Sequence, residues 1–214
     1  MNDILSVGII LSIVLISVIL HELMHGVVAY WLGDKTAKYA GRLTLNPIKH
    51  IDPYMSIIVP VLLYIMHAPV FGGAKPVPVD NRNLKWKEWG MALVAIAGPL
   101  TNLAIAFVAF LIGHFSGVLY GFAGEIPMFI ASEFVIVNIG FMLFNLIPIP
   151  PLDGSRVLYA IAPDNIRSYM ELLEGPRGLI VVYALIFLLG PVFSSIMSNG
   201  MNGVLQLFYF VVGQ

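Results

Sequence analysis

Three ionisable side chains lie within an apolar run near the start of the chain. The stretch "VLISVILHELMHGVV", from residue 14, carries His21, Glu22 and His25 among aliphatic residues. On a helix, positions four apart share one face, so both imidazoles project in the same direction. The His-Glu-x-x-His spacing is typical of helical zinc sites, in which the glutamate acts as general base. The stretch therefore predicts a metal site with a base beside it.

A second interpretation is that these residues only hydrogen-bond between packed helices, as histidine does in membrane bundles. Two observations favour metal ligation. The composition gives a chance match to the pattern of only about 0.3%. Adjacent ionisable groups inside an apolar segment are also unfavourable unless they have a function or a strong partner.

The composition indicates an integral membrane protein. Hydrophobic residues make up 59% of the 214 residues and charged residues only 11%, with a mean hydropathy of +0.91. A soluble domain carries about 25% charged residues. The absence of cysteine excludes disulfides and thiolate metal sites. The net charge of -1 gives no reason to expect nucleic acid as a partner. The first apolar run follows no Lys or Arg and precedes no small-residue cleavage site, which argues against a signal peptide.

Apolar runs divide the chain into spans. Each of four runs reaches the ~20 residues that a bilayer helix needs: Ile4–Leu32, Trp89–Gly113, Ile126–Pro150 and Leu179–Met197. Two shorter runs are Tyr54–Phe71, interrupted by Pro60 and Pro69, and Val204–Val212. We expect a single domain over residues 1–214. Its fold would be an all-α integral membrane bundle of about four to six transmembrane or re-entrant segments.

The basic residues suggest a topology. If Tyr54–Phe71 enters and leaves on the same side, all 11 Lys and Arg residues fall on one side of the membrane, which would be the cytoplasm. The loop His114–Glu125, on the other side, has none. We therefore expect a re-entrant or oblique hairpin at residues 54–71, in a multi-pass protein of the cell membrane whose site faces the cytoplasm.

Short alternating stretches follow the first span. "RLTLNP" and "AKPVPV" read as strands broken by Gly and Pro, and predict a small β element near the cytoplasmic face.

A third metal ligand must come from elsewhere in the sequence, because a catalytic zinc takes three protein ligands. In "NLIPIPPLDG", Asn145 to Gly154, the prolines must end the preceding helix, and Asp153 follows at the turn. Its carboxylate could point back into the bundle, or could form an Asx turn before Gly154. Of the other histidines, His50 suits a hydrogen-bonded loop, and His67 and His114 suit packing or interfacial roles.

Three motifs in this order, "HELMH", "AGPLTN" and "NLIPIPPLDG", resemble the site-2 protease family of intramembrane zinc metalloproteases. "GRLTLNPIKHIDP" and "FGGAKPVPVDNRNL" resemble its compact branch without a PDZ domain, and the resemblance runs from Ile4 to about Arg177. Met24 departs from the small residue that the family usually has before the second histidine.

The resemblance implies an activity and its residues. One Zn²⁺ per chain would be bound by His21, His25 and Asp153, with Glu22 as the catalytic base and Asn145 near the scissile carbonyl. The substrates would be single-span membrane proteins, cleaved within or near their transmembrane segments in regulated intramembrane proteolysis.

Two roles remain open for Asn102 of "AGPLTN", namely binding substrate at the site or hydrogen-bonding across helices. Two other functions also remain. A zinc-binding sensor would keep the ligands without needing Glu22, and a transporter would often show repeated halves, which this sequence does not.

A transmembrane substrate must unwind before it is cleaved, and its freed backbone groups then need partners. Strand addition to an exposed edge would supply them. In "GGAKPVPVD", Pro76 and Pro78 remove donors from one side, and Lys75, Val77 and Val79 keep theirs on the other. We expect these three residues to pair with substrate, the alternative being a rigid loop without substrate contact.

Overall fold

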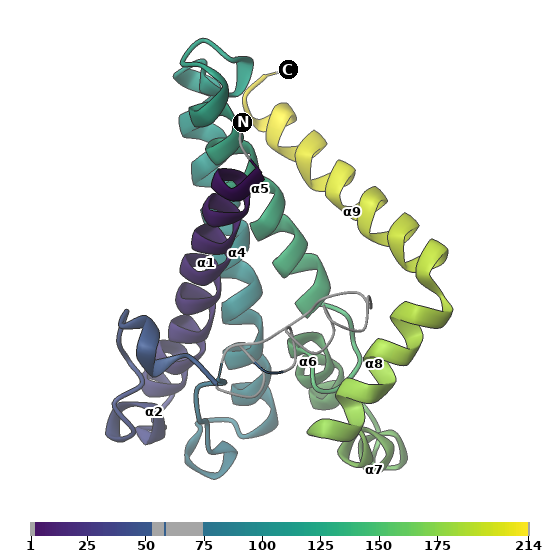
Figure 1. The fold of residues 1–214 in the computed structure, drawn as a ribbon. Helices are drawn as coiled ribbons and strands as arrows, with labels where there is room; N and C mark the ends of the chain where they lie inside the picture. Colours follow the sequence, from purple (N-terminus) through teal and green to yellow (C-terminus); the bar gives the residue numbers. More distant parts are fainter. Residues whose placement is uncertain (1–2, 53–57, 59–74, 214) are drawn as a thin grey trace.

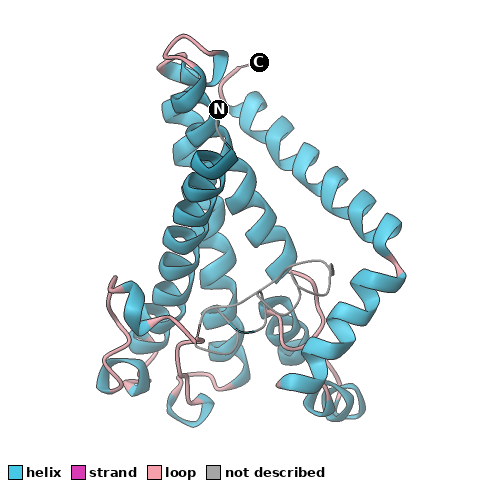
Figure 2. Cartoon of the chain, in the orientation of Figure 1, coloured by secondary structure: helices cyan, strands magenta, loops and turns pink. Residues whose placement is uncertain are grey.

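The computed structural model describes residues 3–52, 58 and 75–213. Regular secondary structure in these residues is helical throughout, which confirms the predicted helical class (Figure 2). The predicted hairpin at residues 54–71 lies outside the described residues, apart from Ile58.

Three long apolar helices lie side by side and form the body of the molecule (Figure 1). They are α1 (Asp3–Trp31), α4 (Glu88–Phe115) and α5 (Glu125–Asn145). Each is long and apolar enough to cross a membrane, and α4 packs against both of the others. Three of the four predicted spans are therefore single helices, with bounds within a few residues of those expected from the apolar runs.

The fourth predicted span is divided. Helix α8 (Pro176–Leu188) meets α9 (Gly190–Val211) at an angle of 93°. The number of candidate membrane spans among the described residues is therefore three, or four if this bent pair is one broken span. The break coincides with Gly190 and Pro191. Proline lacks the N–H that would continue the α8 ladder, yet suits the first turn of a new helix. The short run Val204–Val212 covers the end of α9 and its C-cap, and its Phe208 packs with Phe110 and Ile139 in the main apolar core.

Shorter elements gather beyond one end of the bundle and at the loop between α4 and α5. They are α2 (Thr36–Tyr39), η1 (Pro47–Lys49), η3 (Asn81–Asn83), η4 (Val118–Tyr120), α6 (Asp153–Ile161) and α7 (Asp164–Leu172). Helix α6 packs against α4 near one end of the bundle (Figure 1).

The predicted β element is not supported. No strand occurs in residues 3–52 or 75–213, and "RLTLNP" forms bends that lead into η1. Residues 75–80 lack helical structure, but three of their N–H groups donate to single acceptors and not to a neighbouring strand: Lys75 to His50 O, and Val77 and Asp80 to carboxylates. Pro76 and Pro78 remove the alternate donors that a ladder would need.

The buried carboxylate of Asp34 joins residues 75–80 to the end of α1. Asp34, fully buried, accepts hydrogen bonds from Thr36 N and Oγ1 at 3.0 and 2.5 Å, and from Asn83 Nδ2 at 3.2 Å. Its other oxygen accepts Asp80 N–H at 2.7 Å. Burial opposes ionisation, but these hydrogen bonds outweigh it and hold the pKa of Asp34 below its usual range. The loop after α1 and the segment before α4 are thereby joined at one side chain.

Replacing Asp34 with alanine is expected to lower the free energy of unfolding by on the order of 2–3 kcal/mol, because buried donors lose a charged acceptor. The folded-state pKa lies below that of the unfolded chain. The stabilisation is therefore present at neutral pH and is lost as the pH falls through the folded-state pKa. Thermal unfolding in detergent at several pH values measures both effects. Asp164→Ala is the control, since that side chain is 99% exposed, and an equal loss in both variants would contradict the assignment.

Candidate metal centre

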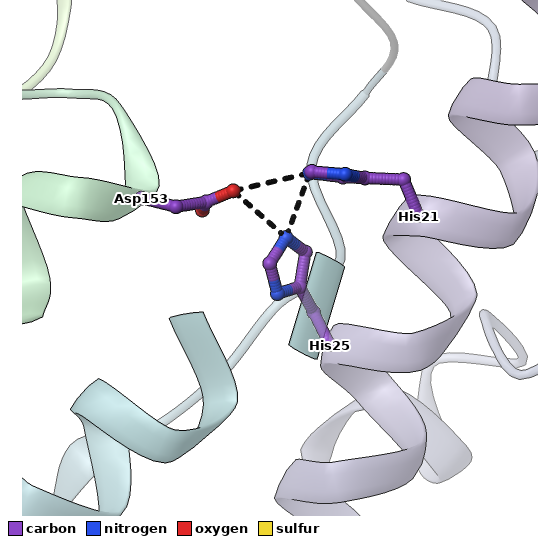
Figure 3. Close-up of side chains that lie close together, drawn as sticks. All are labelled: His21, His25 and Asp153. Atoms are coloured by element: carbon purple, nitrogen blue, oxygen red, sulfur yellow. Dashed lines mark hydrogen bonds and ion pairs between the residues drawn. The ribbon is translucent and has the colours of Figure 1, made fainter. Parts of the chain in front are cut away.

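His21 and His25 of α1 and Asp153 of α6 meet at one point, although Asp153 lies far from both along the chain (Figure 3). The Nε2 atoms of the two histidines are 3.0 Å apart. Asp153 Oδ2 lies 3.1 Å from His21 Nε2 and 3.4 Å from His25 Nε2. The structure thus brings together the three residues that the sequence predicts as ligands.

The path of the chain after α5 explains how Asp153 reaches this point. Helix α5 ends at Asn145, and the proline-rich turn leads directly into α6, whose first residue is Asp153. The turn is tight, because a Cβ added at Gly154 would lie 2.2 Å from the carbonyl oxygen of Leu146. Asp153 Oδ2 is buried and accepts no hydrogen bond within the described part of the chain. The N–H of Ser155, which an Asx turn at Asp153 would use, donates instead to Leu152 O at 3.0 Å.

The chemistry of these atoms fits a metal ion. Both histidines direct Nδ1 to oxygen acceptors, His25 to Val94 O at 2.8 Å and His21 to Asn102 Oδ1 at 2.6 Å. With the protons on Nδ1, both Nε2 atoms carry lone pairs and face a carboxylate oxygen. Donor atoms on a tetrahedral zinc lie roughly 3.3 Å from one another when the bonds are about 2.0–2.1 Å. The observed separations of 3.0, 3.1 and 3.4 Å are close to that value.

Gly98 of α4 gives the imidazoles their space. A Cβ at this position would lie 2.5 Å from His21 Cε1 and 2.5 Å from His25 Nε2. The two rings therefore rest directly on the backbone of α4, one residue before Pro99, and any side chain at position 98 would displace them.

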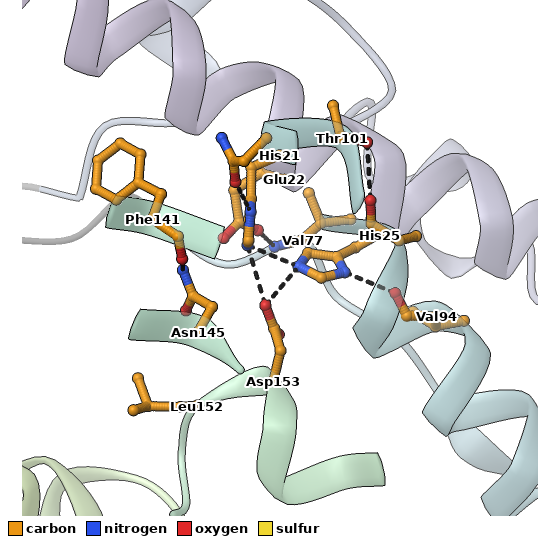
Figure 4. Close-up of polar contacts among 12 residues, drawn as sticks. His21, Glu22, His25, Val77, Val94, Thr101, Phe141, Asn145, Leu152 and Asp153 are labelled. Atoms are coloured by element: carbon orange, nitrogen blue, oxygen red, sulfur yellow. Dashed lines mark hydrogen bonds and ion pairs between the residues drawn. The ribbon is translucent and has the colours of Figure 1, made fainter. Parts of the chain in front are cut away.

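Glu22 lies beside the ligands on the same helix. Its Oε2 accepts the main-chain N–H of Val77 at 2.8 Å (Figure 4). Val77 is buried and packs on α1, since a Cβ at Gly26 would lie 3.0 Å from Val77 Cγ1. Residues 75–80, which we call the crossing segment, are held further by Arg42 Nη2, which donates to Lys75 O at 2.5 Å.

The other predicted site residues make hydrogen bonds or packing contacts of their own. Asn145, at the end of α5, donates from Nδ2 to Phe141 O at 3.0 Å in its own helix (Figure 4). Asn102 is fully buried and donates to Asn138 Oδ1 on α5, which is the interhelical role left open for it. Lys75 N–H donates to His50 O, and Val79 packs beside Ala29 and Val94.

The remaining histidines have structural contacts. His50 is buried, with Nε2 bonded to Thr44 O, as expected for a loop histidine. His114 stacks on Phe110 and bonds to Tyr120, which confirms a packing role, while His67 lies outside the described residues.

Sequence reasoning missed Asn138 and Ser17. Asn138 Nδ2 donates to Ser17 Oγ at 2.9 Å, and both residues are fully buried. The available signal was their polarity: each interrupts an apolar run, and a polar side chain within a membrane helix needs a partner.

Comparisons with known proteins identify the family to which the chain is similar. Residues 9–132 match the model of peptidase family M50, a range that includes His21, His25 and Asn102 and ends before Asp153. A protein of Bacillus subtilis named "Putative zinc metalloprotease YwhC" is 38% identical over 200 residues, covering 91% of this chain and 88% of the relative. The protein of the same type named Rip2 in Mycolicibacterium smegmatis is 32% identical over 150 residues, covering 67% of this chain and 53% of the relative. No solved structure gives a significant match. With its helix-borne histidine pair and the third donor on α6, the chain belongs to peptidase family M50, the site-2 protease family.

Proposed function

We propose that this protein is a zinc metalloendopeptidase that hydrolyses peptide bonds within or near the transmembrane segments of single-span membrane proteins. The observation that carries the proposal is the convergence of His21, His25 and Asp153 beside Glu22. This convergence occurs on a helix long enough to cross a bilayer, and His21 lies about 15 Å from the C-terminal end of that helix. A site at that depth can reach a peptide bond inside the membrane.

We assign the metal ligands, the general base and the oxyanion donor of hydrolysis to different residues. His21, His25 and Asp153 would hold one zinc ion per chain, and when bound the ion supplies Lewis-acid polarisation and a water that is acidic near neutral pH. Glu22 would accept the proton of the attacking water and pass it to the leaving amine. Asn145 has a second amide hydrogen beyond the one bonded to Phe141, and this hydrogen would donate to the developing oxyanion.

The crossing segment is the proposed partner of an unwound substrate. Val79 N–H, which donates no hydrogen bond within the described residues, is one proposed donor to the substrate. Lys75 and Val77 would pair only after releasing His50 O and Glu22. Substrate and catalytic base would then compete for the same N–H of Val77.

The site is proposed to face the cytoplasm of a multi-pass cell-membrane protein, because the basic loops flank residues 54–71 on both sides. Single cysteines placed at Lys49 and Arg82 would then react with an impermeant reagent from the same side, and reaction from opposite sides would rule out this topology.

Metal content and cleavage should separate when Glu22 is replaced with glutamine. The purified protein is reconstituted with a panel of single-span substrates, and zinc is measured by elemental analysis. Glu22→Gln is expected to keep about one zinc per chain and to lose cleavage by about 10²- to 10⁴-fold, because only proton transfer is removed. His25→Ala is expected to lose the metal, and a chelator should abolish wild-type cleavage.

The same measurements distinguish the rival functions. Cleavage that survives in Glu22→Gln would disprove the peptidase mechanism, and zinc binding without cleavage of any substrate would favour a sensor. Full zinc occupancy in Asp153→Ala would remove Asp153 from the ligand set.

A further inference from the structure

We infer that Asn138 and Asn102 form a buried relay that sets which nitrogen of His21 carries its proton, and so turns the lone pair of Nε2 toward the metal position. Both are positioning residues that act through His21. The inference rests on the proposed zinc site, but it concerns the tautomer of His21, which can be measured without metal.

The direction of the relay is fixed at a main-chain carbonyl. Asn138 Nδ2 lies 2.8 Å from Phe134 O, and a carbonyl oxygen can only accept a hydrogen bond. The amide nitrogen of Asn138 must therefore occupy this position, because the flipped amide would place two oxygens in contact. Ser17 Oγ, at 2.9 Å, accepts the second hydrogen of the same nitrogen.

The remaining steps follow from that orientation. With its nitrogen committed, Asn138 presents Oδ1 to Asn102 Nδ2 at 2.8 Å. Asn102 must then present Oδ1 to His21 Nδ1, at 2.6 Å. An oxygen acceptor at that distance requires the proton of His21 to lie on Nδ1, which leaves Nε2 as the lone-pair atom. Three helices thus determine one tautomer, since Phe134 and Asn138 belong to α5, Asn102 to α4 and His21 to α1.

The two metal-facing histidines reach the same state by different routes. His25 Nδ1 donates directly to Val94 O, a main-chain acceptor that cannot change direction. His21 depends on two side-chain amides, each of which could flip if it were alone. Asn102, Asn138 and Ser17 are each 0% exposed, so water does not offer an alternative partner, and the network holds one arrangement.

The competing explanation is that the asparagines only hold the helices together, as interhelical amides do. Loss of such contacts would lower stability without changing the tautomer of His21. A readout of the tautomer itself therefore separates positioning from packing.

The first measurement uses wild-type protein, metal-free and labelled with ¹⁵N-histidine, in detergent micelles. The His21 signals are assigned by their disappearance in His21→Gln. We expect the Nδ1-protonated form, identified by the nitrogen shifts and by the proton attached to Nδ1. A His21 ring protonated on Nε2 alone, without a proton on Nδ1, would overturn the inference, and this result does not depend on any relay variant folding.

The second measurement follows the variants Asn138→Leu and Asn102→Leu. Asn138 does not touch His21, yet its replacement should produce a mixture of His21 tautomers and weaken zinc binding by about 10-fold or more, in the range known for residues behind metal ligands. Asn102→Leu should have at least as large an effect. Thr101→Val is the matched control: among the described residues, the hydroxyl of this neighbour on α4 donates to Ala97 O of its own helix, and its loss should leave tautomer and affinity unchanged.

The outcomes separate this inference from the proposed function. A folded Asn138→Leu protein with a single Nδ1-protonated His21 and wild-type zinc affinity would refute the relay and leave the peptidase proposal intact. Absence of zinc binding in the wild type would refute the proposed zinc site, while the metal-free spectrum would still decide the relay.

Discussion

Gly98→Ala is expected to abolish zinc binding and proteolysis although it alters no ligand. The added Cβ would lie 2.5 Å from His25 Nε2 and 2.5 Å from His21 Cε1, and real Cβ atoms do not approach so closely. Metal–ligand distances in functional sites stay within about 0.2 Å of their preferred values. Displacing both imidazoles by half an ångström or more should therefore weaken zinc binding by at least about 10²-fold.

The backbone of α4 cannot easily retreat to accept the methyl group. It is packed between α1 and α5, and its residue Asn102 is bonded to both of those helices. The same helix holds the ring of His25 through Val94 O and the ring of His21 through Asn102 Oδ1. The strain thus falls on the orientation of the rings and not on the fold, so helix content should remain normal while zinc is lost.

Gly140→Ala is the matched control. Gly140 lies in α5. Apart from its chain neighbours and the adjoining backbone of the same helix, no described atom comes within 4 Å of a Cβ at that position. Alanine favours a helix over glycine by about 1 kcal/mol, so this variant should be as stable as the wild type or slightly more so. Circular dichroism and elemental analysis on both variants decide the matter. Full zinc occupancy in Gly98→Ala would show that the rings do not rest on this glycine.

The parts of the site that the sequence could predict depend on local geometry. His21 and His25 share a helical face because four residues make about one turn, whatever else the chain does. The three bundle helices follow from apolar runs of sufficient length. Asp153 could be predicted as a ligand because three prolines must end α5 and turn the chain just before this residue.

The parts that could not be predicted depend on distant partners. The β element failed because the alternation in "AKPVPV" does not reveal that Val77 N–H bonds to a side chain 55 residues earlier. The Asn138 relay joins residues from three helices, and no spacing within one helix encodes it. The partners of Asp34, at Asp80 and Asn83, are equally remote in sequence.

Val77→Pro is expected to reduce cleavage by about 10²-fold or more while zinc content stays normal. The substitution deletes the one N–H that Glu22 Oε2 accepts from the crossing segment, at 2.8 Å. Pro76 and Pro78 already flank the position, so the local backbone is one that proline tolerates. Without that hydrogen bond, the carboxylate of Glu22 is free to leave the orientation in which it can take a proton.

Two further variants decide why Val77 matters. Val77→Ala keeps the N–H and trims the side chain that packs on α1, so it should retain most of the activity if the hydrogen bond is what counts. Val79→Pro removes the next donor along the segment, which has no acceptor within the described residues. If the segment acts by pairing with substrate, Val79→Pro should be nearly as inactive as Val77→Pro. If its main role is to orient Glu22, Val79→Pro should cleave normally, and full activity in Val77→Pro would exclude both roles because each requires that N–H.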